Sequence, residues 1–154
     1  MLIQKETLLD VLQEQLEARR RASWEAMLAA QESANEQSKS SAGDKYETGR
    51  SMGQLDRSMH ARQYEQARQE LLLLEKLRLM ESEQPPDLVR VGSLVQTTAQ
   101  EYIFISISMG ACLVEDTTVW AVSAATPLGK SLLGKRVGDR FELKGKAQTI
   151  ATIY

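Results

Sequence analysis

The chain is poor in the residues on which several common protein classes depend. It has one cysteine, Cys112, so no intrachain disulfide can form, and this fits the reducing cytoplasm. Its single histidine, His60, is far from Cys112 in the sequence, which leaves Cys-His or Ser-His-Asp catalysis without partners. No apolar run approaches the ~18 residues of a membrane span, and no secretory signal opens the chain. We expect a cytoplasmic protein without membrane contact.

An excess of charge of one sign is also missing. The net charge is −2, with twelve basic and fifteen acidic residues in 1–84 and seven and six in 85–154. Neither part predicts a strongly basic nucleic-acid-binding surface. The run Arg19 to Arg21 is expected on the solvated side of a helix, where His60 is also expected; contact of this run with RNA is an alternative.

What is present divides the chain in two. Only four β-branched residues occur in 1–84, whereas nineteen occur in 85–154. The first part is therefore composed for helix and the second for sheet. Pro85 and Pro86 end the helical part, because proline lacks an N–H and disfavours helix in the preceding residue. We predict two domains, 1–84 and 85–154.

The first domain is predicted to be an antiparallel helical hairpin. One amphipathic helix is expected from Leu2 to about Ser38, and the turn-forming segment SKSSAG then interrupts it. A second helix is expected from about Tyr46 to Glu83, which places the tip near 39–48. Its apolar seam is expected to use eight positions, with a stutter after Met59: Met52, Leu55, Met59, Tyr64, Ala67, Leu71, Leu74 and Leu77. The alternative is that both helices pack on the sheet in one compact domain.

The second domain is predicted to be a small sheet with one short helix, which makes the protein α+β. Alternating residues in EYIFISIS and apolar runs in LVRVGSLVQTT, ACLVED and TVWAVSA indicate strands, and a final pair turns near Gly145. Pro127 is suited to the first turn of a helix that ends near Gly134. We expect a mostly antiparallel sheet.

Two acids mark the expected tip of the hairpin. Asp44 and Glu47 are three positions apart, so at the start of a helix they lie on the same side of its first turn. One interpretation is a capping box, in which both carboxylates bind backbone N–H groups. The other is that they help to bind Mg²⁺, which prefers oxygen ligands, inside the active site of a larger partner.

Several motifs resemble the bacterial Gre transcript-cleavage factors. The segments VGSLV (91–95) and ATPLGKSLLGKRVGDRFEL (125–143) are similar to the family's strand start and its S-P-[IL]-G-x-x-L-[IL]-G-K-x-x-G-D pattern. Gly43-Asp44-x-x-Glu47 is similar to the family's tip motif G-D-x-x-E-N, with Thr48 in place of the asparagine. The resemblance implies an N-terminal antiparallel coiled coil and a C-terminal domain of FKBP-like fold.

The resemblance also implies a function and a set of roles. The protein would dock on RNA polymerase as a monomer and insert its coiled coil into the secondary channel. Asp44 and Glu47 would be the catalytic acids, holding Mg²⁺ together with the polymerase so that the polymerase cleaves backtracked RNA. Partner binding would fall to a docking loop and two nearby lysines: Thr126, Pro127, Leu128, Lys130 and Lys135. The chain would bind no cofactor tightly, contact the RNA 3′ end only indirectly and be no enzyme by itself.

Two other functions stay open. The changed residues around the tip, Thr48, Gly49 and Gly53, favour a Gre-like regulator that binds the polymerase channel without promoting cleavage. An FKBP-like fold alone suggests a prolyl isomerase, although fold analogy is a weak basis for function. The second domain has only Phe104, Phe141 and Trp120 for the aromatic pocket of such an enzyme.

Overall fold

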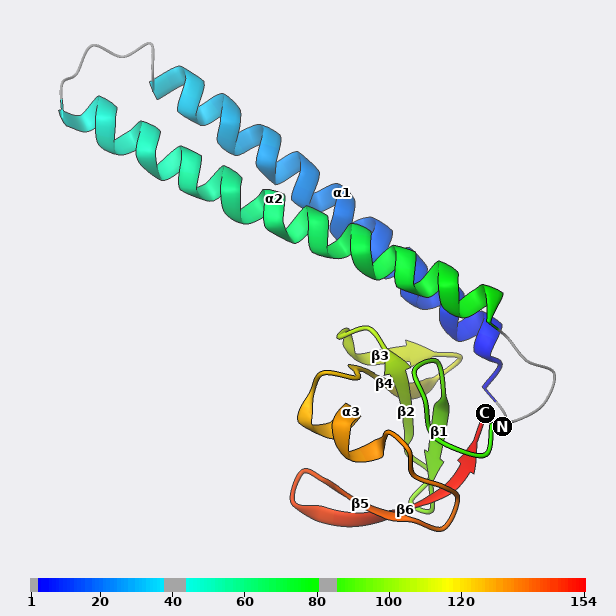
Figure 1. Ribbon diagram of the computed structural model, residues 1–154. Coiled ribbons are helices and arrows are strands. Elements are labelled where there is room, and N and C mark those ends of the chain that lie inside the picture. Colours follow the sequence, from blue (N-terminus) through cyan, green and yellow to red (C-terminus); the bar gives the residue numbers. More distant parts are fainter. Residues whose placement is uncertain (1–2, 38–43, 81–85) are drawn as a thin grey trace. The chain divides into compact units, whose positions relative to one another are not determined.

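The chain is α+β, as predicted, with two long helices followed by a sheet and a short helix (Figure 1). The computed structural model describes the backbone of 3–37, 44–80 and 86–154, and the side chains of 3–36, 51–80 and 86–154. Most of the predicted turn and the predicted boundary at 84–85 lie outside these ranges. The division into domains at residue 84 stays a prediction.

Helices α1 (Lys5–Gln37) and α2 (Asp44–Leu79) pack together (Figure 1). Three contacts define their direction: Asp10 meets Arg78, Trp24 meets Tyr64, and Ala34 lies closest to Gly53. Residues later in α1 thus contact residues earlier in α2, and the two sequence numbers change by nearly the same amount. The helices form the antiparallel hairpin that the sequence predicts.

The seam of α2 is the predicted one from Tyr64 to Leu77, but not in the part before Tyr64. One row of buried or half-buried residues runs along α2 in alternating steps of four and three, the spacing of a regular heptad. This row consists of Gly53, Arg57, His60, Tyr64, Ala67, Leu71 and Leu74. The exposed fractions of Met52, Leu55 and Met59 are 56%, 64% and 43%, so these residues lie outside the seam. The predicted stutter was wrong because it joined an exposed apolar row to the true seam.

The structure consists of two compact units. The first contains 1–13 and 72–154, and the second contains 14–71. In the first unit the hairpin has a leucine core, with Leu8, Leu9, Leu12, Leu74 and Leu77 buried. Arg78 donates hydrogen bonds there to Asp10 Oδ1 at 2.5 Å and to Gln13 Oε1 at 3.0 Å. In the second unit, which we call the distal hairpin, the buried residues are mostly small.

The sheet has six strands in the order β3-β4-β2-β1-β6-β5. The strands are β1 (Leu94–Thr97), β2 (Tyr102–Ser106), β3 (Gly110–Val114), β4 (Thr117–Ser123), β5 (Arg140–Leu143) and β6 (Lys146–Ile153). Four pairings are antiparallel, but β2 and β4 are parallel, so the sheet is mixed rather than wholly antiparallel. Every residue of central strand β2 is buried, including Tyr102 and Ser106, which the alternating pattern assigns to a second face.

The core of the sheet lies under the short helix α3 (Pro127–Leu132). Leu132 of α3 packs with Ile103 and Ile105 of β2 and with Phe141 of β5 in one buried cluster. Leu128 packs against the same cluster. The helix therefore fixes the position of the segment that the sequence assigns to partner binding.

Candidate functional site

The TPLGK segment folds as a capped helix start. Thr126 is the N-cap of α3: its Oγ1 accepts a hydrogen bond from Gly129 N at 3.1 Å and donates one to Ser123 O at 2.7 Å. Pro127 occupies the first turn, where a missing N–H costs nothing. The sequence prediction of a helix that begins at this proline is confirmed, and Gly134 follows the helix with a positive φ of 80°.

Gly129 is required where α3 approaches β4. A Cβ at this position would lie 2.1 Å from Ser123 O, far inside contact distance. The glycine of the motif thus allows close packing of backbone on backbone. This gives part of the motif a structural role that is independent of any partner.

The five predicted partner-binding residues divide by exposure. Pro127 and Lys130 are exposed, whereas Thr126, Leu128 and Lys135 are half-buried. Lys135 also has a backbone role, because its carbonyl accepts a hydrogen bond from Val89 N at 2.8 Å. Pro127 and Lys130 are therefore the residues of this set that a partner can contact with least rearrangement.

Two of the three aromatic residues considered for an isomerase pocket are buried in the second domain. Phe104 and Phe141 are buried in the sheet interior, with exposed fractions of 1% and 5%. Trp120 is half-buried, and Lys144 Nζ stands 4.4 Å from the centre of its ring. This arrangement gives no support to the isomerase alternative.

The two predicted tip acids fall at the beginning of α2. Asp44 is the first residue of that helix and Glu47 is in its first turn. Their side chains lie outside the described residues, as do the Mg²⁺ ligation and the capping box assigned to them. Among the described residues, no group of three or more His, Cys, Asp or Glu side chains could hold a metal ion.

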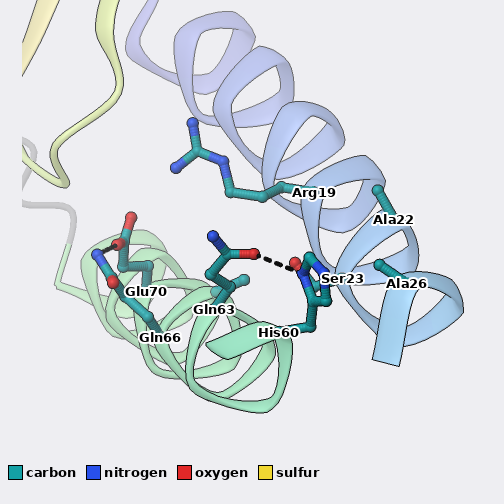
Figure 2. Close-up of a pocket in the computed structure, with 9 residues that line it drawn as sticks. Arg19, Ala22, Ser23, Ala26, His60, Gln63, Gln66 and Glu70 are labelled. Carbon is teal, nitrogen blue, oxygen red and sulfur yellow. Dashed lines mark hydrogen bonds between the residues drawn. The ribbon is translucent and has the colours of Figure 1, made fainter. Parts of the chain in front are cut away.

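The distal hairpin carries a groove of about 500 Å³ between α1 and α2, which the sequence did not indicate (Figure 2). Small side chains of α1, namely Ala22, Ser23 and Ala26, leave this space beside the seam. The other lining residues are polar or small: Arg19, His60, Gln63, Gln66, Ala67 and Glu70. The groove therefore combines a small-residue wall on α1 with polar groups mainly from α2.

Hydrogen bonds along α2 orient the polar groups of the groove. His60 Nδ1 lies 3.2 Å from Gln63 Oε1, and Gln66 Nε2 donates to Glu70 Oε1 at 2.9 Å (Figure 2). The second carboxylate oxygen, Glu70 Oε2, is buried and has no hydrogen-bond partner. Leaving a buried carboxylate oxygen without a hydrogen bond costs free energy. A cation or a hydrogen-bond donor that bound Glu70 Oε2 would therefore offset this cost.

His60 was expected on the hairpin surface, and the structure places it in the groove at that surface, closer to the seam than expected. It is half-buried at a seam position and lines the groove. The signal that could have placed it is the heptad spacing that joins Gly53, His60, Ala67 and Leu74. Hydrophobicity hides this spacing because only one of the four residues is strongly apolar.

Comparisons with known proteins add no assignment. No protein-family model matches the chain, and none of the curated proteins is significantly similar to it. Within the described ranges, the helices are too polar or too short to cross a membrane.

Proposed function

We propose that the protein is a Gre-like transcription factor that docks on RNA polymerase, inserts its helical hairpin into the secondary channel and stimulates cleavage of backtracked RNA. The observation that carries the proposal is the position of the tip motif: Asp44 begins α2 and Glu47 follows in the same turn of helix. The sheet domain with its capped TPLGK helix supports it as a docking module.

Geometry limits what the acids can do alone. Residues three apart in a helix face the same side, so both carboxylates can approach one cation. Two carboxylates are too few for a site of six oxygen ligands, and carboxylates and waters of the partner must supply the rest. When bound between the two proteins, Mg²⁺ would activate water for attack on a phosphodiester. The chain itself contributes negative charge and its positioning at the end of a helix.

The test is RNA cleavage in stalled, backtracked polymerase complexes. Asp44→Ala and Glu47→Ala are each expected to reduce cleavage by at least about 100-fold while polymerase binding is retained. Asp56→Ala, which removes an exposed acid from the same helix, is the matched control and should leave cleavage unchanged. Normal cleavage by the Asp44→Ala/Glu47→Ala double variant would contradict the catalytic assignment.

A second candidate is a regulator that occupies the channel without promoting cleavage. It is favoured by Thr48, which stands where the Gre tip motif has asparagine. This candidate predicts that the chain competes with an active cleavage factor for polymerase and shortens no RNA at any Mg²⁺ concentration. RNA shortening by the purified protein would decide for the first candidate.

A further inference from the structure

We propose that the distal hairpins of two copies of the chain associate in parallel to form a four-helix bundle, through the face that carries the groove. This groove face includes the groove and the exposed residues in line with it on both helices. The proposal replaces the monomer expected from the sequence, and it does not depend on the proposed polymerase contact.

On the groove face, the side chains of α1 are small and those of α2 are large. Ala22 and Ala26 line the groove, and Ala29 stands one heptad after Ala22 on the same side of the helix. On α2, Met59 and Met52 stand one and two heptads before the groove residue Gln66. One helix thus offers a hollow and the other offers two exposed methionines.

The levels of the two helices show how a second copy would fit. Trp24 is level with Tyr64 and Ala34 with Gly53, which places Ala29 level with Met59 and Arg19 level with Glu70. A two-fold axis parallel to the hairpin would set α1 of each copy against α2 of the other at the same level. Each Met59 would then face the Ala26 and Ala29 region of the other copy, which is the self-complementarity that a two-fold interface requires.

The same axis brings opposite charges together. Arg19 would face Glu70 of the second copy, and the symmetry would form this pair twice. Within the described part of the chain, no ion pair joins Arg19 to Glu70, and Glu70 Oε2 lacks any hydrogen-bond partner. A guanidinium can bind both oxygens of a carboxylate, and the soft terminal torsion of glutamate allows Oε2 to turn toward it. A two-fold axis perpendicular to the hairpin and lying across its face would instead set α1 against α1 in the reversed direction, so Arg19 would not face Glu70.

The opposite side of the distal hairpin supplies a control surface. Trp24 and Leu28 lie there, one position beyond the seam, with exposed fractions of 45% and 51%. The Trp24 ring is already in contact with Tyr64 of the same chain, at 5.4 Å between ring centres. Exposed apolar area alone therefore does not distinguish the two sides, whereas Arg19, Glu70 and the groove all belong to the groove face.

The test is sedimentation velocity of the full chain from about 1 to about 500 µM. We expect a dimer that dissociates on dilution. Met59→Lys should weaken it about tenfold or more, and Leu28→Lys, the same change on the opposite side, should leave it unchanged. Arg19→Glu and Glu70→Arg should each weaken the dimer, and combining them should restore it, because the swapped charges again face each other.

All four positions are exposed or half-exposed, so the variants should retain the helical circular dichroism of the parent. If Met59→Lys fails to fold, Met59→Ser gives the same comparison. A chain that stays monomeric at the highest concentration would overturn the proposal. So would a dimer that Leu28→Lys weakens as much as Met59→Lys. Loss of polymerase binding in Arg19→Glu and Met59→Lys, from a monomeric parent, would instead assign the groove face to the polymerase.

Discussion

Gly53 has an unfavourable helix propensity but a favourable role in the packing of the two helices. Glycine inside a helix costs about 1 kcal/mol relative to alanine, and the sequence alone therefore suggests a loosened start to α2. A Cβ at Gly53, however, would lie 2.9 Å from Ala34 Cβ and 3.2 Å from Ala34 Cα. The cost in propensity is offset by a close approach of the two helices that no other residue permits.

Gly53→Ala is therefore expected to destabilise the hairpin although it improves propensity. Relieving the contact with Ala34 costs about 1–3 kcal/mol, against a gain of about 1 kcal/mol from alanine. Ala34→Gly combined with Gly53→Ala removes the Cβ contact and should recover most of the loss. Thermal unfolding followed by circular dichroism measures both, and a rise in Tm for Gly53→Ala alone would show that the helices can separate freely.

Thr126 tests whether the TPLGK motif has a structural role apart from docking. Thr126→Ala removes the N-cap hydrogen bond to Gly129 N and the bond to Ser123 O, and should lower the free energy of unfolding by about 1 kcal/mol. Thr126→Ser should retain most of it. Lys130→Ala, at an exposed position in the same helix, should leave the stability unchanged. If all three variants were equally stable in chemical denaturation, the N-cap hydrogen bond would not contribute to stability.

At the scale of elements, the helices and strands could be predicted from sequence more completely than the faces they bury. The leucines of α1 and the end of α2 mark the seam because they alone are strongly apolar at heptad spacing. Nearer the tip the seam consists of Gly53, Arg57 and His60, while Met52 and Leu55 are exposed. A search for apolar residues at helical spacing selects the exposed Met52 and Leu55 here. It does not detect a seam made of a glycine in close helix contact and of half-buried polar residues.

The exposed face of α2 contains an ion pair whose effect depends on pH. Arg68 donates to both carboxylate oxygens of Glu65, at 2.6 and 2.9 Å, and this hydrogen bonding lowers the pKa of Glu65 below 4.5. The pair therefore favours the helix above about pH 4.5 and ceases to do so as the pH falls through the lowered pKa.

We expect Glu65→Gln to be slightly less stable than the parent at neutral pH and equally stable at acid pH. The effect is small because both side chains are about half exposed. Thermal unfolding of both proteins between pH 7 and about pH 3 measures it. A stability difference that grows as the pH falls would contradict the assignment.

At the scale of the whole molecule, the two compact units are built from different cores. The first unit buries leucines of the hairpin and both faces of β2, whereas the distal hairpin buries mainly small side chains around Ser23, Ala34 and Ala67. Because apolar burial provides most of the stability, the distal hairpin should open more easily than the sheet.

Hydrogen exchange should show this difference. At concentrations where the chain is monomeric, backbone amides of 20–36 and 51–66 are expected to exchange at least about 100-fold faster than those of Ile103 and Ile105 in β2. Their positions in separate units make the comparison possible within one sample. Uniform protection throughout the chain would mean that both units open together.

The close contact of Gly53 with Ala34 also determines the register of the hairpin. A slip of α2 along α1 by one heptad would move it about 10 Å and place His60 or Tyr46 opposite Ala34, where neither fits. Near the tip, the exposed Met52 and Leu55 do not favour one register over another, so the close contact at Gly53 contributes to this selection. The ten residues from Asp44 to Gly53 then form a fixed length of helix, so the distance of the two acids from this contact depends on a residue whose side chain is only a hydrogen atom.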